Sequence, residues 1–135
     1  MTSDSSGTPL ARKLSLRDGM RVWFDGMPED VFDEIAEYAL ELTFVANPAD
    51  GIDAAHVFVS ERSVLETRLK ALREQIASDG QVWVSWPKQA SNVPTDITED
   101  TIRALCLPLG FVDTKVCGVD EVWSGLKLVI RKELR

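Results

Sequence analysis

The stretch that decides the fold is Gln81-Val82-Trp83-Val84-Ser85-Trp86-Pro87-Lys88. Its first six residues are rich in β-branched and aromatic types, and they lie between a turn, Asp79-Gly80, and the strand-breaking Pro87. The apolar residues run almost without alternation, which is typical of a strand buried on both faces. We therefore predict a central strand in a sheet that helices cover on both sides.

The composition is that of one globular domain. A chain of 135 residues suits a single hydrophobic core, and its 44% hydrophobic and 27% charged residues are ordinary proportions. The net charge of -7 argues against nucleic acid as a partner, because phosphate binding needs a basic face. No apolar run approaches the roughly 18 residues of a membrane span, so we expect no membrane partner.

The ends of the chain and its cysteines bear on location. Residues 1–8 are small and polar, so we expect them to be disordered and residues 9–135 to form the domain. The N-terminus lacks a signal-peptide pattern, which favours the cytoplasm. Cys106 and Cys117 match no metal or redox spacing, so we expect free thiols and no metal site.

Six strands are expected from short β-rich runs at residues 20–24, 42–45, 54–59, 81–86, 111–117 and 126–131. A turn of helix at residues 9–16 directs Leu10 and Leu14 inward.

Three longer helices are expected between the strands. The first begins at Pro28 and runs to about residue 40, with Val31, Ile35 and Tyr38 inward and an acidic outer face. The second is capped by Ser60 and stopped by Gly80. The third runs from a Thr98 cap to Gly110.

The alternation of strands and helices predicts a parallel sheet with right-handed crossovers. The last two strands are joined by only eight residues, 118–125, so they should be antiparallel neighbours. We predict an α/β fold of three layers, with a six-stranded, mostly parallel sheet in the order 2-1-3-4-6-5 and strand six reversed.

This topology, over residues 20–131, resembles the Rossmann-like class I methyltransferase fold. An enzyme of that class carries a Gly-rich turn after strand one, where this chain has Phe24-Asp25-Gly26-Met27-Pro28. A helix and a strand of the usual N-terminal half are also missing. The candidates to hold a ribose, Asp50 and Asp53, lie among proline and glycine. We therefore expect no cofactor and no binding of S-adenosylmethionine.

Four stretches carry a closer resemblance: 19–22, 82–88, 94–96 and 115–126. They are similar to the signature of a family of small bacterial proteins catalogued only as a domain of unknown function. This resemblance implies a methyltransferase-like core and brings no established activity with it.

Polar side chains gather where the fourth and fifth strands end. The loops that leave the carboxyl ends of parallel strands meet at one edge of a sheet, where ligands bind. Two amines, two carboxylates, an indole and a hydroxyl at this edge suit a polar ligand or proton transfer. These candidate ligand-binding residues are Lys88, Asp96, Lys115, Asp120, Trp123 and Ser124.

The same residues also have structural interpretations. Lys88 and Lys115 can pair with Asp96 and Asp120 and hold the loops to the sheet. Asp96 can instead cap backbone amides, and Trp123 can be a lid over the sheet end.

His56 and Cys117 carry little chemistry in this interpretation. The only histidine, His56, is expected at the start of strand three, away from the candidate edge, which argues against histidine-based catalysis. Cys117 follows Lys115 by two residues, but buried cysteines are usually inert fillers.

Three functions remain open. The leading hypothesis is a non-catalytic domain that binds a small polar ligand or a protein partner at the carboxyl edge. The alternative is an atypical transferase or methyltransferase that uses Lys88, Asp96 and Asp120. The third is a structural subunit of a homo-oligomer that associates through an edge strand or a helix face.

Overall fold

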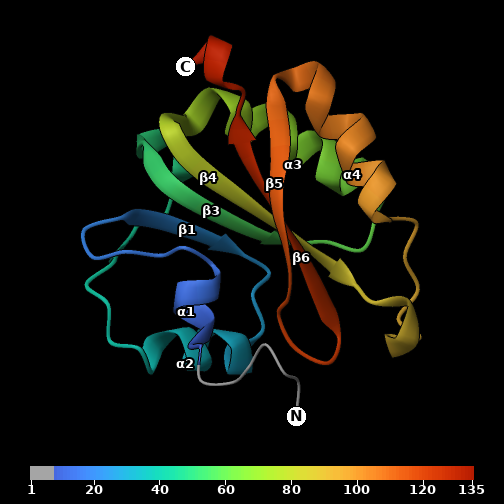
Figure 1. Cartoon of the computed structure of the whole chain (residues 1–135), viewed down its shortest axis with the longest axis horizontal. Helices are drawn as coiled ribbons and strands as arrows, with labels where there is room; N and C mark the ends of the chain where they lie inside the picture. Colours follow the sequence, from blue (N-terminus) through green and yellow to red (C-terminus); the bar gives the residue numbers. More distant parts are fainter. Residues whose placement is uncertain (1–7) are drawn as a thin grey trace.

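The strand order in the computed structural model is β2-β1-β3-β4-β6-β5, as expected (Figure 1). The structure describes residues 8–135, so the disorder predicted for residues 1–8 falls outside the described residues, except for Thr8. The strands are β1 (Arg21–Asp25), β2 (Thr43–Phe44), β3 (Ile52–Phe58), β4 (Ile76–Pro87), β5 (Phe111–Gly118) and β6 (Trp123–Ile130). The α-helices are α1 (Leu10–Lys13), α2 (Glu29–Ala36), α3 (Arg62–Gln75) and α4 (Glu99–Cys106).

The directions of the strands are also as predicted. Strands β2, β1, β3 and β4 are parallel, whereas β6 runs antiparallel to both of its neighbours, β4 and β5. The last reversal follows from the short β5–β6 connection, which is long enough for a hairpin and too short for a crossover. Among residues 8–135, no helix has the length and apolarity that a membrane span requires.

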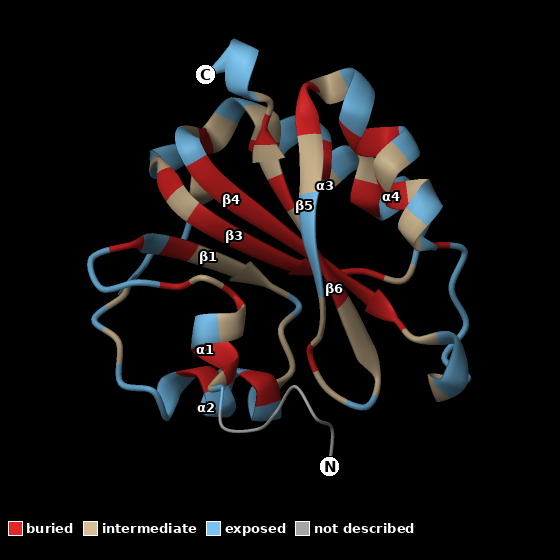
Figure 2. Cartoon of the chain, in the orientation of Figure 1, coloured by how far each residue is buried: buried red, intermediate tan, exposed pale blue. Residues whose placement is uncertain are grey.

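Strand β4 lies at the centre and contributes to two cores. Val82, Val84 and Trp86 pack under α3 and α4, whereas Trp83 packs under α1 and α2 on the other face. Figure 2 shows β3 and β4 mostly buried, while the middle of the outer strand β5 is exposed. The prediction of a strand buried on both faces is therefore confirmed.

Two predicted helix ends are wrong. Helix α3 ends at Gln75 and β4 begins at the next residue, so Gly80 stops no helix. Gly80 lies inside β4, where a Cβ atom would come within 2.6 Å of the Asp53 carbonyl oxygen, so glycine allows β3 and β4 to approach there. Helix α2 ends at Ala36, and Tyr38 beyond it is exposed rather than inward-facing.

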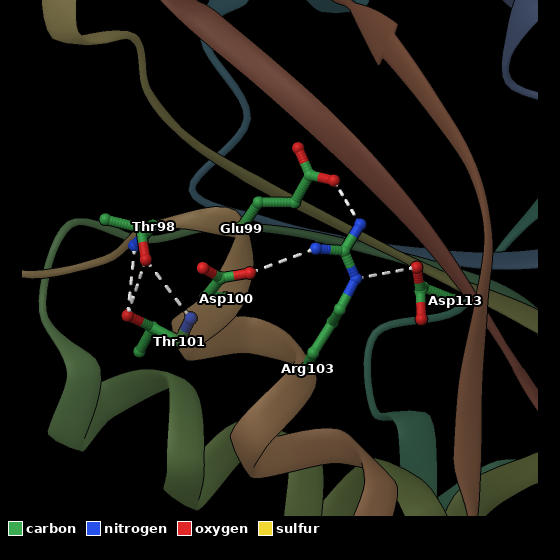
Figure 3. A network of polar contacts seen from close by, with 6 residues as sticks. All are labelled: Thr98, Glu99, Asp100, Thr101, Arg103 and Asp113. Atoms are coloured by element: carbon green, nitrogen blue, oxygen red, sulfur yellow. Dashed lines mark hydrogen bonds and ion pairs between the residues drawn. The ribbon is translucent and has the colours of Figure 1, made fainter.

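Helix α4 is held by a network of polar contacts that Figure 3 shows. Its cap is the predicted one: the Thr98 hydroxyl accepts from the Thr101 N–H (3.2 Å), and the Thr101 hydroxyl accepts from the Thr98 N–H (3.2 Å). Arg103 then pairs with Glu99 and Asp100 on its own helix, and its Nε donates to Asp113 of β5 (2.9 Å). These contacts fasten α4 to the sheet.

The hairpin between β5 and β6 is tighter than expected. Strand β6 begins at Trp123, so Trp123 and Ser124 lie in a strand and not in a loop. The Asp120 Oδ1 accepts hydrogen bonds from the N–H groups of Val122 (2.9 Å) and Trp123 (2.8 Å). These two bonds close the turn within four residues, which a pattern of apolar residues does not reveal.

Candidate functional site

The carboxyl ends of β1 and β3 form the switch point of the sheet, from which the chain extends to β2 on one side and to β4 on the other. The loop after β1 turns at Gly26, which has a φ of +71°. A Cβ atom on Gly26 would lie 3.1 Å from the Phe58 carbonyl oxygen at the end of β3. The loop is therefore packed directly against the switch point.

A pocket of about 480 Å³, here called the phenylalanine pocket, opens beside this loop. Phe24 of β1, Phe32 of α2 and Phe44 of β2 form its aromatic wall, and their ring centroids are 5.6 to 6.4 Å apart. Glu29 is the one charged residue in the described lining, which Val22, Gly26, Met27 and Val45 complete.

A second hollow of about 130 Å³ lies against the same two rings, Phe32 and Phe44. All of its described lining side chains are apolar, and its other lining residues are Ile35, Ala36, Leu40 and Leu42. Phe44 is 55% exposed and Phe32 is 38% exposed, although each lies in a regular element. The two hollows therefore lie side by side on one largely apolar surface, and the exposed rings of Phe32 and Phe44 stand between them.

The helix beside this surface is acidic. Glu29, Asp33 and Glu37 are spaced by four residues along α2 and its C-terminal cap, and α2 contains no lysine or arginine. Carboxylates at this spacing lie on one side of a helix and repel one another. The surface around the phenylalanine pocket therefore favours neutral or cationic groups over anions.

The residues present do not fit S-adenosylmethionine. The Asp25 carboxylate at the end of β1 is paired with Arg68 of α3 (Nε–Oδ2 2.5 Å), and α3 covers the face of the sheet opposite to α2. Asn47, which follows β2, uses its side chain to cap the next turn through the Ala49 N–H (2.9 Å). Asp53 lies at the amino end of β3, where it accepts the Arg21 N–H (2.9 Å), so it is at the wrong edge to hold a ribose.

The structure brings four of the six predicted site residues to one place. The Lys88 N–H donates to the Val122 carbonyl oxygen (2.7 Å), next to the turn that Asp120 closes. Trp123 opposes Pro87 and Ser124 opposes Trp86 in the β4–β6 ladder. Lys88, Asp120, Trp123 and Ser124 therefore lie around the β5–β6 hairpin.

The other two predicted site residues are bound elsewhere. The Asp96 Oδ1 accepts the Arg62 N–H (2.7 Å) at the start of α3, and the Lys115 Nζ donates to the carbonyl oxygen of Lys13 (2.9 Å), the last residue of α1. The expected pairing of Lys115 with Asp120 does not form, because Asp120 serves its own turn. Ser60 is not the cap of α3 either, since Asp96 supplies that hydrogen bond from the β4–α4 loop.

His56 is in the middle of β3 and buried, not at the start of the strand as expected. Its Nε2 lies 2.7 Å from the Ser85 Oγ, and its ring stacks on Phe58 at 4.4 Å. Burial lowers the pKa of His56 to about 3, so the imidazole is neutral at pH 7. With both side chains shielded from solvent, this pair is part of the core and not a nucleophile with its base.

The phenylalanine pocket was missed at the level of sequence. Its three rings come from β1, α2 and β2. The predicted topology places β2 beside β1, but the residue pattern does not tell which side chains of these elements meet. One signal was available: Phe32 stands between Val31 and Asp33, on the helix side that is otherwise acidic. A single exposed aromatic residue is common, and it indicates a binding surface only where neighbouring apolar residues extend it into a patch.

The fold is shared with methyltransferases of known structure. A SAM-dependent methyltransferase from Aquifex aeolicus matches with a TM-score of 0.62 and 12% identity, over 90% of this chain and 87% of that one. Magnesium protoporphyrin IX methyltransferase from Synechocystis PCC 6803, with SAM bound, gives 0.57 and 13%, over 94% and 77%. Aeropyrum pernix fibrillarin, with natively bound S-adenosyl-L-methionine, gives 0.54 and 10%, over 89% and 73%.

At these identities the comparison establishes a methyltransferase-like core and nothing about the reaction. No protein-family model and no curated protein matches the chain. The resemblance to a small bacterial family therefore stays a prediction.

Proposed function

We propose that this chain is a non-catalytic binding domain on a methyltransferase-like fold. We propose also that the phenylalanine pocket binds a flat aromatic ligand that is either neutral or carries a positively charged group. The observation that supports this proposal is the lining of the pocket. Three phenylalanine rings meet one carboxylate, Glu29, at the carboxyl ends of β1 and β2, next to the switch point where such sheets bind ligands.

The physical chemistry of the lining defines the ligand. A volume of about 480 Å³ lies within the range of small-molecule sites. Phenylalanine rings attract flat rings through stacking and edge contacts, and their faces attract cations. Glu29 and the carboxylates along α2 disfavour an anion. The ligand therefore differs from the polar ligand first expected at the β5–β6 hairpin, where Lys88, Trp123 and Ser124 stay a predicted site.

Three indole compounds of different charge test this proposal. We expect tryptamine, a cation, to bind at least as well as neutral indole, and indole-3-acetate, an anion, to bind much more weakly. Saturation-transfer NMR and titration measure the three affinities. Equal binding of all three, or none, would contradict the proposal.

A matched pair of variants locates the binding. Phe32 and Tyr38 are equally exposed, at 38%, but Tyr38 lies outside both hollows. Phe32→Ala should weaken tryptamine binding by about fivefold, the equivalent of about 1 kcal/mol for one aromatic contact. Tyr38→Ala should leave it nearly unchanged, and thermal melting shows whether both variants are folded.

The second candidate is a SAM-dependent methyltransferase, which the bound cofactors of the fold neighbours favour. S-adenosylmethionine carries a ring, a positive sulfonium and an ammonium group, but also a carboxylate, which Glu29, the one charged side chain in the described lining, would repel. In the same titration we expect no micromolar affinity for S-adenosylmethionine. Micromolar binding that Phe32→Ala abolishes would favour this candidate over a non-catalytic domain.

A further inference from the structure

The outer edge of β2 is open. The Thr43 N–H donates to the carbonyl oxygen of Met20 (2.9 Å), just before β1, and the Val45 N–H donates to that of Val22 (3.0 Å), within β1. Because alternate residues of a strand direct their backbone groups to opposite sides, the N–H and C=O of Phe44 point away from β1. Strand β2 ends the sheet, so within residues 8–135 no neighbouring strand lies on that side.

Side-chain hollows accompany this open backbone. The phenylalanine pocket and the second hollow share Phe44 and Phe32, so both lie beside the β2 edge. Neighbouring side chains on one face of a strand are about 7 Å apart, because they are two residues apart in sequence. Val45 lines the phenylalanine pocket and Leu42 lines the second hollow, so the two hollows follow one another along β2 on either side of Phe44. A strand added to β2 would present apolar side chains at i and i+2 to them.

The negative charge beside the two hollows favours a positively charged binding partner. Glu29 lines the phenylalanine pocket, and Asp33 follows one turn later on the same side of α2. No lysine or arginine lines either hollow within the described chain. Positively charged residues that flank the apolar pair would relieve the repulsion among these carboxylates.

We propose that the edge of β2 binds an extended, basic segment of a partner protein, which adds a strand to the sheet and inserts two apolar side chains into the hollows. This inference rests on the proposed function and names its ligand as a peptide. The pairing is β-strand addition, in which the backbone of Phe44 supplies affinity and the hollows supply specificity.

A second copy of this chain is a poorer occupant. The chain has a net charge of -7, and pairing β2 with its own copy would bring two acidic α2 helices toward each other. The basic segment has the opposite charge and meets no such repulsion.

A synthetic peptide provides the test. The probe is a capped heptapeptide in which lysine alternates with valine or phenylalanine, and two counterparts replace every lysine by glutamate or carry N-methyl groups on the amides that would pair with Phe44. We expect the lysine peptide to bind about tenfold or more tighter than the glutamate peptide, and to weaken as salt is raised. N-methylation should remove most of the affinity, because it blocks the backbone pairing.

Amide hydrogen exchange measures directly whether the peptide pairs with the backbone of β2. Bound peptide should slow exchange of the Phe44 N–H, which faces the open side of β2 and meets no strand among the described residues. Glu29→Gln with Asp33→Asn should weaken peptide binding several-fold, whereas Glu61→Gln with Glu121→Gln, an equal change of charge at exposed residues elsewhere, should not.

The outcomes separate this inference from the proposed function. If the indoles bind but the lysine peptide binds no better than tryptamine, or leaves Phe44 exchange unchanged, the peptide inference is wrong and the pocket stands. If neither indoles nor peptide bind, both are wrong. Concentration-dependent protection of Phe44 without peptide, with a dimer in sedimentation, would overturn the inference in favour of a second copy.

Discussion

His56 is surrounded by groups that carry no charge. Its ring meets Phe24, Phe58 and Trp83, and its Nε2 meets the Ser85 hydroxyl. Burial lowers the pKa of this imidazole to about 3, whereas an exposed histidine in the unfolded chain titrates near 6.5. Folding therefore excludes a proton from this one residue over the whole range between those values.

This exclusion predicts a loss of stability in acid. Above about pH 6.5 His56 is neutral in both the folded and the unfolded chain, so it takes nothing from the free energy of unfolding. As the pH falls from there toward about 3, only the unfolded chain takes up the proton, so the free energy of unfolding decreases. The slope should reach about 1.4 kcal/mol per pH unit below about pH 6. Urea unfolding at a series of pH values between 7 and 4 measures it.

His56→Gln is the control for that slope, because its amide nitrogen can still reach Ser85 and does not titrate. Its stability should change less with pH than that of the parent. Parallel curves for the two proteins would mean that carboxylates, and not His56, set the acid sensitivity.

At the scale of single elements, α3 and α4 begin in different ways. The cap of α4 is local, with Thr98 and Thr101 three residues apart, and the sequence was enough to predict that Thr98 caps it. The first amide of α3 is instead capped by Asp96, which is 34 residues away. That contact also ties the β4–α4 loop to α3, together with the Thr95 hydroxyl, which donates to the Ser60 carbonyl oxygen (2.7 Å).

Replacing Asp96 distinguishes a cap from a ligand-binding residue. Asp96→Ala should lower the free energy of unfolding by about 1 kcal/mol, the usual cost of losing a capping hydrogen bond. Asp96→Asn should keep most of the stability, since its carbonyl oxygen still accepts the Arg62 N–H. Urea midpoints measure both, and an Asp96→Ala protein as stable as the parent would return Asp96 to the candidate binding residues.

At the scale of the molecule, Trp83 joins the sheet to the N-terminal layer. Its side chain is 1% exposed, and its indole N–H donates to the Leu14 carbonyl oxygen after α1 (2.9 Å). Gln81 donates to the same oxygen (2.7 Å). Gly125 of β6 makes room for the ring, because a Cβ atom there would lie 3.2 Å from the Trp83 Cε3.

Trp83→Ala should therefore cost about 3–5 kcal/mol through lost burial and an open cavity. A domain of this size has about 5–15 kcal/mol of stability in total, so the variant should be close to unfolding at 37 °C. Trp83→Phe should cost less, because it keeps most of the volume and Gln81 still satisfies Leu14. A urea midpoint for Trp83→Ala near that of the parent would show that β4 is not central.

The residue pattern was enough to predict the order and type of the elements, the six-stranded topology with its reversed last strand, and the Thr98 cap. Each of these depends on periodicity, turn residues and hydrogen bonds within a few positions of one another. Three contacts could be seen only in the tertiary structure: Asp96 caps α3, Lys115 binds the last residue of α1, and Phe24, Phe32 and Phe44 meet. Such contacts join elements distant in the chain, and their geometry depends on how whole layers pack, which no local pattern of residues records.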